Sequence, residues 1–482
     1  MRWKFIAEIC GVLIFFVGIA LLFPLGWAVV FRDEGLYPLF YSMVTAVICG
    51  GILRVVFRQK TIRPVSAREG MVIVTFGWVA VAFFGAVPFW FSGYFGSIGG
   101  AFFESMSGFT TTGSSVLTNI EAVPDSILLW RSFIQWIGGM GIVLFSIAIL
   151  PFIGVGGMEL YKAEVPSPVP DKLKPRLQET AKMLWWVYSI ISILQIIALK
   201  FGGMSLFDSL CHTFTTMPTG GFSPKNLSVA HYNSVYIDVV ITVFMIIAGL
   251  NFSLHFQFLR GKKFIFFKDI ESRVFLGTIL FFSLLIAFDV WGDVYDSFFK
   301  AFRYSSFQVV SIITTTGYAT ADFELWPGMS QLILFIAMFI GACAGSTGGG
   351  MKFIRVIIGF KYCYKQVFSL IHPHGVKQIK LEGVKVEDSI VDSILGFILL
   401  YIILFAFASL MLSFLGVDFI TTISAVASSI GNVGPGLGSV GPTENYSCIP
   451  EAGKWLLSFC MLLGRLEIYT VITLFFPVFW KD

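Results

Sequence analysis

Residues 110–114 read Thr-Thr-Thr-Gly-Ser, a short polar run inside an otherwise apolar chain. Related runs follow at Thr219-Gly220-Gly221, at Thr314-Thr315-Thr316-Gly317-Tyr318 and, in a looser form, at Asn432-Val433-Gly434-Pro435-Gly436. We call these four stretches the polar runs. They recur at intervals of roughly 100 residues, which indicates that the chain repeats one structural unit four times.

The composition is that of a membrane protein. The 482 residues are 56% hydrophobic and only 13% charged, whereas soluble domains carry about 25% charged residues. Apolar stretches close to the ~20 residues that cross a bilayer recur from end to end. The fold class that we predict is therefore an all-α polytopic membrane protein. The net charge of +4 lies mostly in loops, so no nucleic-acid partner is expected.

Each repeat has the same order of elements: a full span, a short apolar segment, a polar run and a second full span. The short segments are too short to cross a membrane, so we expect ten full crossings, four half-crossings and a pseudo-fourfold arrangement. The half-crossings are predicted at residues 99–109, 206–216, 298–313 and 419–430. The expected domains are two N-terminal spans (1–65) and four pore repeats (66–165, 166–265, 266–380 and 381–482).

Charge predicts the orientation of the chain. The loops between repeats are rich in Lys and Arg, which places them and both termini in the cytoplasm by the positive-inside rule. The polar runs then face outward. The first apolar stretch is too long for a secretory signal and is interpreted as a retained helix. Acidic residues are expected near the outer mouth, namely Asp289, Asp293, Asp322, Glu324 and Asp418.

The polar runs are predicted to form a cation filter. Irregular backbone cannot face lipid and must line a cavity or be buried in protein. Glycine permits positive φ, and rings of carbonyl oxygens can replace the hydration shell of a monovalent cation. The half-crossings would also aim their negative helix ends at the centre. The residues expected to bind the ion, mainly through backbone carbonyls, are Thr111, Thr112, Gly113, Thr219, Gly220, Thr315, Thr316, Gly317, Asn432, Val433 and Gly434.

Close helix packing by small residues is the alternative interpretation of each run. It suits one isolated run better than four, each placed after a half-length segment and between two full spans.

The four ordered motifs resemble the Trk/Ktr/HKT superfamily of potassium transporters, and the two additional N-terminal spans are most similar to its bacterial Trk branch. The motifs are Phe103-Glu104-Ser105 with Phe109 to Gly113, Met217 to Phe222, Thr314 to Ala319 and Gly431 to Gly436. The resemblance implies potassium as substrate, no organic cofactor and location in the bacterial cytoplasmic membrane. It also implies a homodimer and a cytosolic, nucleotide-binding regulatory ring, with membrane lipids as further partners.

A glycine-rich loop interrupts the second span of the third repeat. Residues 341–350 read Gly-Ala-Cys-Ala-Gly-Ser-Thr-Gly-Gly-Gly, and each Gly costs a helix about 1 kcal/mol relative to Ala. We expect a loop below the polar runs that blocks or clears the path, and the resemblance implies that it is a gate. Tight packing or a phosphate-binding loop are the alternatives. The expected gate residues are Gly345, Ser346, Thr347, Gly348, Gly349 and Gly350.

Two basic residues are candidates for a barrier in the pore. Arg465 lies within the last span, where a charge normally faces the bundle interior, and Lys352 is the weaker candidate. Pairing of Arg465 with Glu467 is disfavoured because residues two apart do not face each other on a helix. Glu104 is expected to stabilise the N-terminal end of the first half-crossing or to hold neighbouring runs by hydrogen bonds. Asp208 and His212 are expected to form a satisfied polar pair rather than a proton relay.

The function predicted from these features is potassium-selective uptake through a central pore, and not an enzymatic activity. A secondary transporter of another small solute and a less selective symporter of monovalent cations are the alternatives. An intramembrane enzyme that uses Cys211, His212 and Asp208 is disfavoured, because these residues adjoin a repeat position that the filter already explains.

Overall fold

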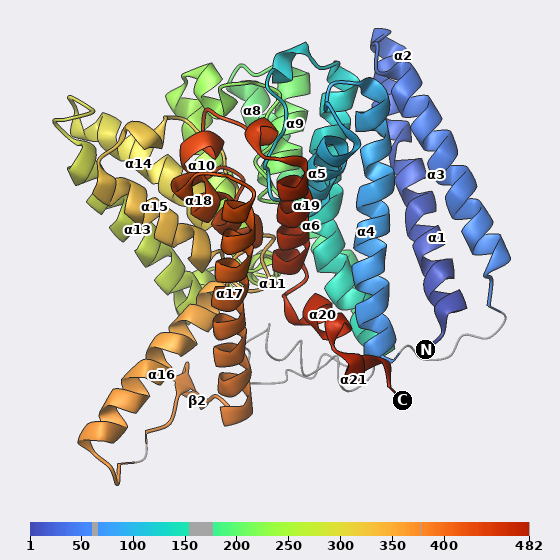
Figure 1. Ribbon diagram of the computed structural model, residues 1–482. Coiled ribbons are helices and arrows are strands. Elements are labelled where there is room, and N and C mark those ends of the chain that lie inside the picture. Colours follow the sequence, from blue (N-terminus) through green and yellow to red (C-terminus); the bar gives the residue numbers. More distant parts are fainter. Residues whose placement is uncertain (60–65, 154–176, 376, 482) are drawn as a thin grey trace.

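The structure is a computed structural model that describes residues 1–59, 66–153, 177–375 and 377–481 (Figure 1). It is a bundle of helices, which confirms the predicted all-α class. Both chain ends lie at one end of the bundle, and we call this end the terminal face. Several basic residues of the loops between repeats lie outside the described residues, namely Lys60, Arg63, Lys162, Lys172, Lys174 and Arg176.

The N-terminal helices form a separate layer at the side of the repeats (Figure 1). They are α1 (Trp3–Ala20), α2 (Leu22–Phe31) and α3 (Leu36–Val56). Helices α1 and α3 pack closely because glycines face each other: a β-carbon added to Gly50 would lie 2.5 Å from the backbone nitrogen of Phe15. Small residues permit this approach of helices in membranes.

The four repeats follow in chain order. The first comprises α4 (Ala67–Ser92), α5 (Ile98–Phe109) and α6 (Asp125–Ile153). The second comprises α8 (Leu177–Phe201), α9 (Leu206–Thr216), α10 (Val235–Gly249) and α11 (Phe252–Leu259), and α12 (Ile265–Lys268) joins it to the third. The third comprises α13 (Ile270–Val290), α14 (Phe298–Ile313), α15 (Gly328–Ile340) and α16 (Phe353–Ile371). The fourth comprises α17 (Asp388–Phe414), α18 (Phe419–Gly431), α19 (Glu451–Arg465), α20 (Tyr469–Ile472) and α21 (Pro477–Trp480).

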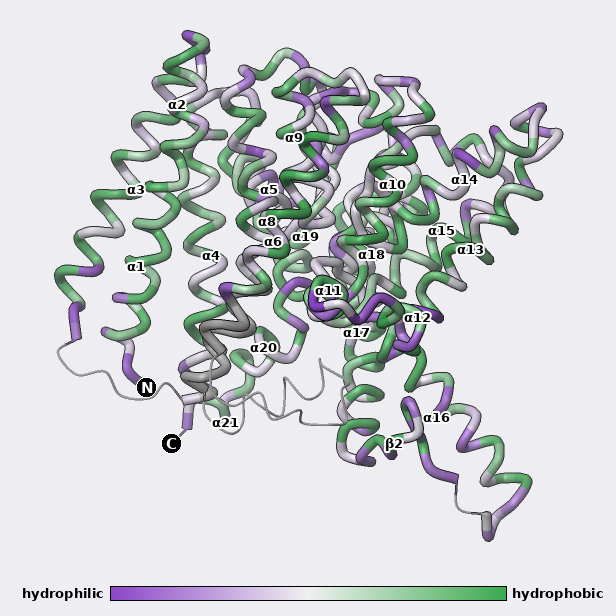
Figure 2. The backbone as a smooth tube through the Cα atoms, turned by 180° about the vertical axis from the view of Figure 1, so that it is seen from behind, coloured by the Kyte–Doolittle hydropathy of each residue, from purple (hydrophilic) through white to green (hydrophobic). Residues whose placement is uncertain are grey.

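Helices α5, α9, α14 and α18 are the predicted half-crossings, and we call them the half-helices. Side chains fix the starts of three of them: Ser97 accepts from the N–H of Gly100 at 2.9 Å, and Ser205 and Asp418 cap α9 and α18 in the same way. Such caps satisfy the first free N–H groups of a helix. Nearly every residue of α5 is buried, so the half-helices form the centre of the molecule. The longer helices that surround the half-helices carry mostly hydrophobic residues (Figure 2).

Two spans that the sequence predicts as continuous are broken. Helices α10 and α11 meet at 100°, and α19 meets the segment Tyr469–Phe475, which begins with α20, at 113°. The expectation that the second and fourth repeats each end in an uninterrupted full span is therefore wrong. Asn251 begins α11 anew by accepting from the N–H of Ser253 at 2.8 Å. Glu467 and Ile468 turn the last span with φ values of 58° and 34°. The break between α15 and α16 at the glycine-rich loop is confirmed.

Helices α16 and α17 project beyond the bundle at the terminal face (Figure 1). A short antiparallel hairpin of β1 (Lys380–Leu381) and β2 (Val384–Lys385) lies between them. The carboxylate of Glu382 in its turn accepts from the N–H of Ile270 at 2.8 Å. The projecting pair is thereby fixed to the start of α13.

Candidate functional site

The four polar runs share one backbone conformation. Each has a non-glycine residue in the left-handed region: Thr111 (φ 54°), Thr219 (56°), Thr315 (60°) and Asn432 (54°). Such φ values are uncommon outside glycine. Each is followed two residues later by a glycine of positive φ, at Gly113, Gly221, Gly317 and Gly434. The residue between them donates its N–H to a carbonyl five positions back, at 2.8 Å for Thr112, Gly220 and Thr316 and at 2.9 Å for Val433.

The runs touch one another in a closed cycle. A β-carbon added to Gly113 would lie 2.2 Å from the carbonyl oxygen of Gly220 in the second run. The same construction places Gly221 against the oxygen of Thr316 (1.8 Å), Gly317 against that of Val433 (2.1 Å) and Gly434 against that of Thr112 (2.8 Å). Every run therefore presses one carbonyl against the glycine of the next. This cycle is the predicted pseudo-fourfold arrangement.

The cycle assigns a role to Gly221 that the sequence analysis missed. The residues expected to bind the ion include Gly220 but not Gly221. In conformation, however, Gly220 corresponds to Thr112, and Gly221 corresponds to Gly113. The sequence contains this signal, because each of the first three runs has a glycine two residues after a threonine, namely after Thr111, Thr219 and Thr315.

Two of the expected carbonyls already accept hydrogen bonds from side chains. The oxygen of Gly434 accepts from the hydroxyls of Ser428 (2.8 Å), Ser114 (3.0 Å) and Tyr446 (2.8 Å). The oxygen of Gly220 accepts from the side-chain amide of Gln135 at 2.8 Å. The four runs are thus alike in backbone and unlike in what surrounds them.

A buried ion pair joins the first run to the second. Glu104 and Arg131 approach to 2.6 Å, and both side chains are almost fully buried. Glu104 also accepts from the N–H of Val116 at 2.8 Å, while Arg131 donates to the carbonyl of Ser223 at 3.0 Å and lies over the ring of Phe222. The hydrogen bonds of Glu104 itself stay within the first repeat, so the expected link to the neighbouring run passes through Arg131.

Tyr318 joins the third run to the second half-helix. Its hydroxyl donates to the carbonyl of His212 at 3.0 Å and contacts the hydroxyl of Thr215. His212 in turn contacts the backbone carbonyl of Asp208 at 2.8 Å and the hydroxyl of Ser223 at 3.2 Å. The expected pairing of Asp208 with His212 therefore runs through the backbone of Asp208.

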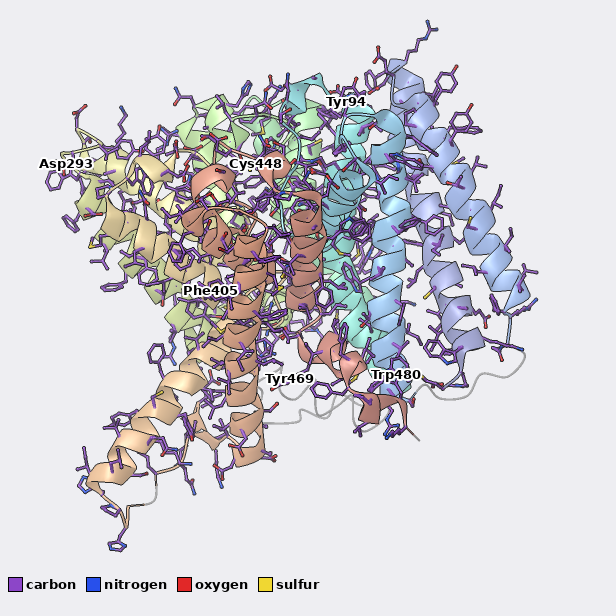
Figure 3. All side chains as sticks on the ribbon, in the orientation of Figure 1. Tyr94, Asp293, Phe405, Cys448, Tyr469 and Trp480 are labelled. Carbon is purple, nitrogen blue, oxygen red and sulfur yellow. The ribbon has the colours of Figure 1, made fainter. Side chains whose placement is uncertain are left out.

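The acidic residues expected at the outer mouth have local partners. Asp289 accepts from the hydroxyl of Ser330 at 2.6 Å, and Asp418 caps α18. Glu324 accepts from the N–H of Gly438. Asp293 lies at the far edge of the molecule (Figure 3). Most of this charge serves helix starts and turns.

The glycine-rich loop lies directly against the polar runs and the ends of the half-helices. The N–H of Gly349 donates to the hydroxyl of Thr315 at 2.7 Å, and that of Gly350 donates to the carbonyl of Gly431 at 2.9 Å. The hydroxyl of Thr347 donates to the carbonyl of Met217 at 2.9 Å. The loop thus contacts three of the four repeats at the C-terminal ends of their half-helices, which we call the inner ends.

Charged side chains form hydrogen bonds with the backbone of the glycine-rich loop. Arg465, 4% exposed, donates to the carbonyl of Thr347 at 2.7 Å and to that of Gly138 at 3.4 Å. The ammonium group of Lys352 donates to the carbonyl of Gly348. The carboxylate of Glu271 accepts from the N–H of Ala344 at 2.8 Å and from that of Ile354 at 3.0 Å.

Glu467 pairs with Arg355 on α16 at 2.5 Å, and not with Arg465. This contact ties the break in the last span, beside Tyr469 (Figure 3), to the helix that leaves the glycine-rich loop. The sequence analysis gave no partner across these elements, because the two residues lie far apart in the chain.

A profile of the TrkH family, described as a cation transport protein, matches residues 38–481. The chain belongs to the TrkH family. It is 37% identical to the Trk system potassium uptake protein TrkH of Salmonella typhimurium, with both chains covered completely, and 37% identical to that of Halomonas elongata. The crystal structure of the potassium transporter TrkH from Vibrio parahaemolyticus superposes with a TM-score of 0.90, at 34% identity and full coverage of both chains.

The buried pair of this TrkH-family protein leads to a stability prediction. Replacing Arg131 by methionine leaves the carboxylate of Glu104 buried without its cation, which costs about 3–5 kcal/mol. We expect a lower thermal unfolding temperature in detergent. Lys365→Met is the matched control, because its partner Asp388 (3.5 Å) is exposed and stays solvated when the cation is removed. Equal losses in the two variants would contradict this prediction.

Tyr446 leads to a selectivity prediction for the same protein. The Tyr446→Phe variant loses one of the three hydroxyl donors to the carbonyl of Gly434, and a neutral hydrogen bond contributes about 0.5–1.5 kcal/mol. The first and fourth runs should then move relative to each other. We expect the permeability ratio of potassium to sodium to fall by about two- to tenfold, measured by reversal potentials. An unchanged ratio would show that Ser114 and Ser428 hold the carbonyl unaided.

Proposed function

We propose that this protein takes up potassium across the bacterial cytoplasmic membrane through a central pore. The observation that carries the proposal is the closed cycle of four runs with matching backbone conformation. Carbonyl oxygens gathered at one level can replace the hydration shell of a monovalent cation. Relatives that are 37% identical over their full length are named potassium uptake proteins. Within the proposal, potassium is the substrate and no organic cofactor takes part.

The filter in this proposal consists of the four polar runs, with Gly221 added to the residues expected from the sequence. The half-helices support it, because their inner ends carry the negative end of the helix dipole. The repeats at 66–165, 166–265, 266–380 and 381–482 supply one run each, and residues 1–65 stand outside the pore.

The gate in this proposal is the glycine-rich loop, with Arg465 and Lys352 as the basic groups beneath the filter. The contacts of the loop with the inner ends of three half-helices support this role, since a loop held there lies next to the proposed filter. Opening requires loss of the hydrogen bonds that Thr347, Gly349 and Gly350 make there. Arg465 adds positive charge at the same level and opposes cation entry.

The terminal face is cytoplasmic in this proposal, since basic loops favour the cytoplasmic side. The further partners are a second copy of the chain and a cytosolic nucleotide-binding ring of the Trk/Ktr type. The helices α16 and α17, which project beyond the bundle at the terminal face, supply surface for such contacts (Figure 1).

Flux of rubidium and potassium into vesicles that contain the purified protein tests the function. We expect cation-selective flux, and ion replacement should place the reversal potential near that of potassium. Absence of cation flux, or saturable uptake of an organic solute that alkali cations do not inhibit, would overturn the proposal. The carbonyl of Gly434 already accepts hydrogen bonds from three hydroxyl groups. This favours a second candidate function, a less selective symporter of monovalent cations. Equal flux of sodium and potassium would support that candidate.

A further inference from the structure

Residues 259–268 form an exposed segment that joins basic and aromatic side chains. Its four basic residues are all exposed, namely Arg260, Lys262, Lys263 and Lys268. Leu259, Phe264 and Phe267 are 62%, 70% and 67% exposed. We call residues 259–268 the basic aromatic segment.

The segment lies at the terminal face, close to the ends of the spans. Helix α11 turns away from α10 by 100°, so the chain leaves the span sideways before it reaches α12. Figure 2 shows α11 and α12 near the level of α20, whereas α16 projects much farther from the bundle. The segment therefore lies beside the bundle, where the spans end, and not on the part that projects beyond it. Lipid headgroups are expected at the ends of membrane spans.

The chemistry of the segment fits an anionic membrane surface. Aromatic side chains are favoured where hydrocarbon meets water, and a juxtamembrane Lys or Arg is attracted to anionic lipids. Asp269, the acidic residue next to the segment, caps α13 by accepting from the N–H of Ser272 at 2.7 Å. A soluble partner would have to cover the exposed phenyl rings as well as pair the charges, whereas a lipid accommodates both.

The elbow between α10 and α11 connects this segment to the glycine-rich loop. The N–H of Cys343 donates to the carbonyl of Gly249, and the N–H of Phe252 donates to the carbonyl of Gly345, both at 3.0 Å. The hydroxyl of Thr347 lies 3.3 Å from the carbonyl of Ala248. A change in the angle of α11 therefore acts directly on the backbone of the loop.

We propose that the basic aromatic segment binds anionic phospholipids of the cytoplasmic leaflet, and that this binding sets the position of the glycine-rich loop through the elbow. The binding step stands on the segment alone, and the effect on the loop rests on the proposed function as a gated pore. Potassium flux then depends on the anionic lipid content of the membrane.

Lipid binding is tested by native mass spectrometry of the full chain in detergent, titrated with phosphatidylglycerol or phosphatidylcholine. We expect preferential retention of phosphatidylglycerol, and a loss of affinity of about fivefold for each basic residue replaced by glutamine. The variants are K262Q/K263Q and R260Q/K262Q/K263Q/K268Q. R54Q/R58Q, which removes two exposed basic residues at the end of α3, is the control and should retain the lipid. Equal retention of both lipids by the unmodified protein would overturn the binding step.

Rubidium flux is then compared in vesicles of phosphatidylcholine with and without phosphatidylglycerol. We expect several-fold different flux between the two membranes for the unmodified protein and for R54Q/R58Q, and no difference for the fourfold variant. A lipid response that survives in the fourfold variant would overturn the coupling. The coupling would also be overturned if the fourfold variant kept its lipid response and lost only its binding to a cytosolic protein. Absence of flux in every membrane would count against the pore itself, while the mass spectrometry would still decide the lipid site.

Discussion

Replacement of Gly221 by alanine is expected to abolish potassium flux. A β-carbon at this position would lie 1.8 Å from the carbonyl oxygen of Thr316 and 2.9 Å from its carbonyl carbon, so the third run must move. Alanine also disfavours the φ of 70°, by about 1–2 kcal/mol. Both effects act on the contact between the second and third runs, and in the proposed filter the positions of the carbonyls there decide ion binding. We expect a decrease of rubidium flux of at least about tenfold, since displaced backbone in a packed site costs about 1–3 kcal/mol.

Gly203→Ala is the matched control for this prediction. Gly203 has a φ of 92°, yet a β-carbon there would meet no atom within 4 Å. The backbone cost is similar and the steric cost is absent, so flux should be close to that of the unmodified protein. If the two variants lost flux equally, the effect would come from the backbone conformation alone. Normal flux in Gly221→Ala would contradict the closed cycle of runs.

The half-helices could be predicted closely because their signals are local. An apolar segment of half the length of a span, followed by threonine and glycine, has few other solutions in a membrane. Helix α9 has the predicted bounds, 206–216, and α14 has 298–313. The break at residues 341–350 was equally visible, since clustered glycines weaken a helix.

The bends at the ends of α10 and α19 could not be predicted from hydropathy. Leu250, Leu466 and Ile468 continue the apolar pattern across both breaks, so composition gives no sign of a turn. What bends the chain is the cap at Asn251 and the positive φ at Glu467 and Ile468. Such features depend on tertiary contacts.

The partners of the candidate filter were the least predictable part of the site. Gln135 and Tyr446 lie outside the polar runs, and each reaches a carbonyl in or near a run through the folded structure. The role of Arg131 could not be predicted for a similar reason, since the carboxylate with which it pairs lies on another helix. A sequence shows that a buried charge needs a partner, but only the fold selects which residue supplies it.

Replacement of Arg465 by glutamine is expected to increase potassium flux in the absence of any regulatory protein. In the proposed pore, the variant removes a positive charge that opposes cations beneath the filter, and a charge at membrane depth has a large effect on its surroundings. It also removes the donor at 2.7 Å from the carbonyl of Thr347, so the glycine-rich loop loses one of its anchors. Hydrogen bonds to charged groups contribute about 1.5–3 kcal/mol, which corresponds to an increase of about ten- to a hundredfold in the open population.

Rubidium flux into vesicles, normalised to the amount of folded protein, measures this effect, and Arg465→Lys separates its two causes. Lysine keeps the charge but cannot bond the carbonyls of Thr347 and Gly138 with the fork geometry of a guanidinium. If the barrier is mainly electrostatic, the lysine variant should retain low flux. If the anchor dominates, its flux should rise almost as much as that of the glutamine variant. Unchanged or reduced flux in Arg465→Gln, with a normal unfolding temperature, would mean that Glu271 and Lys352 hold the loop closed without it.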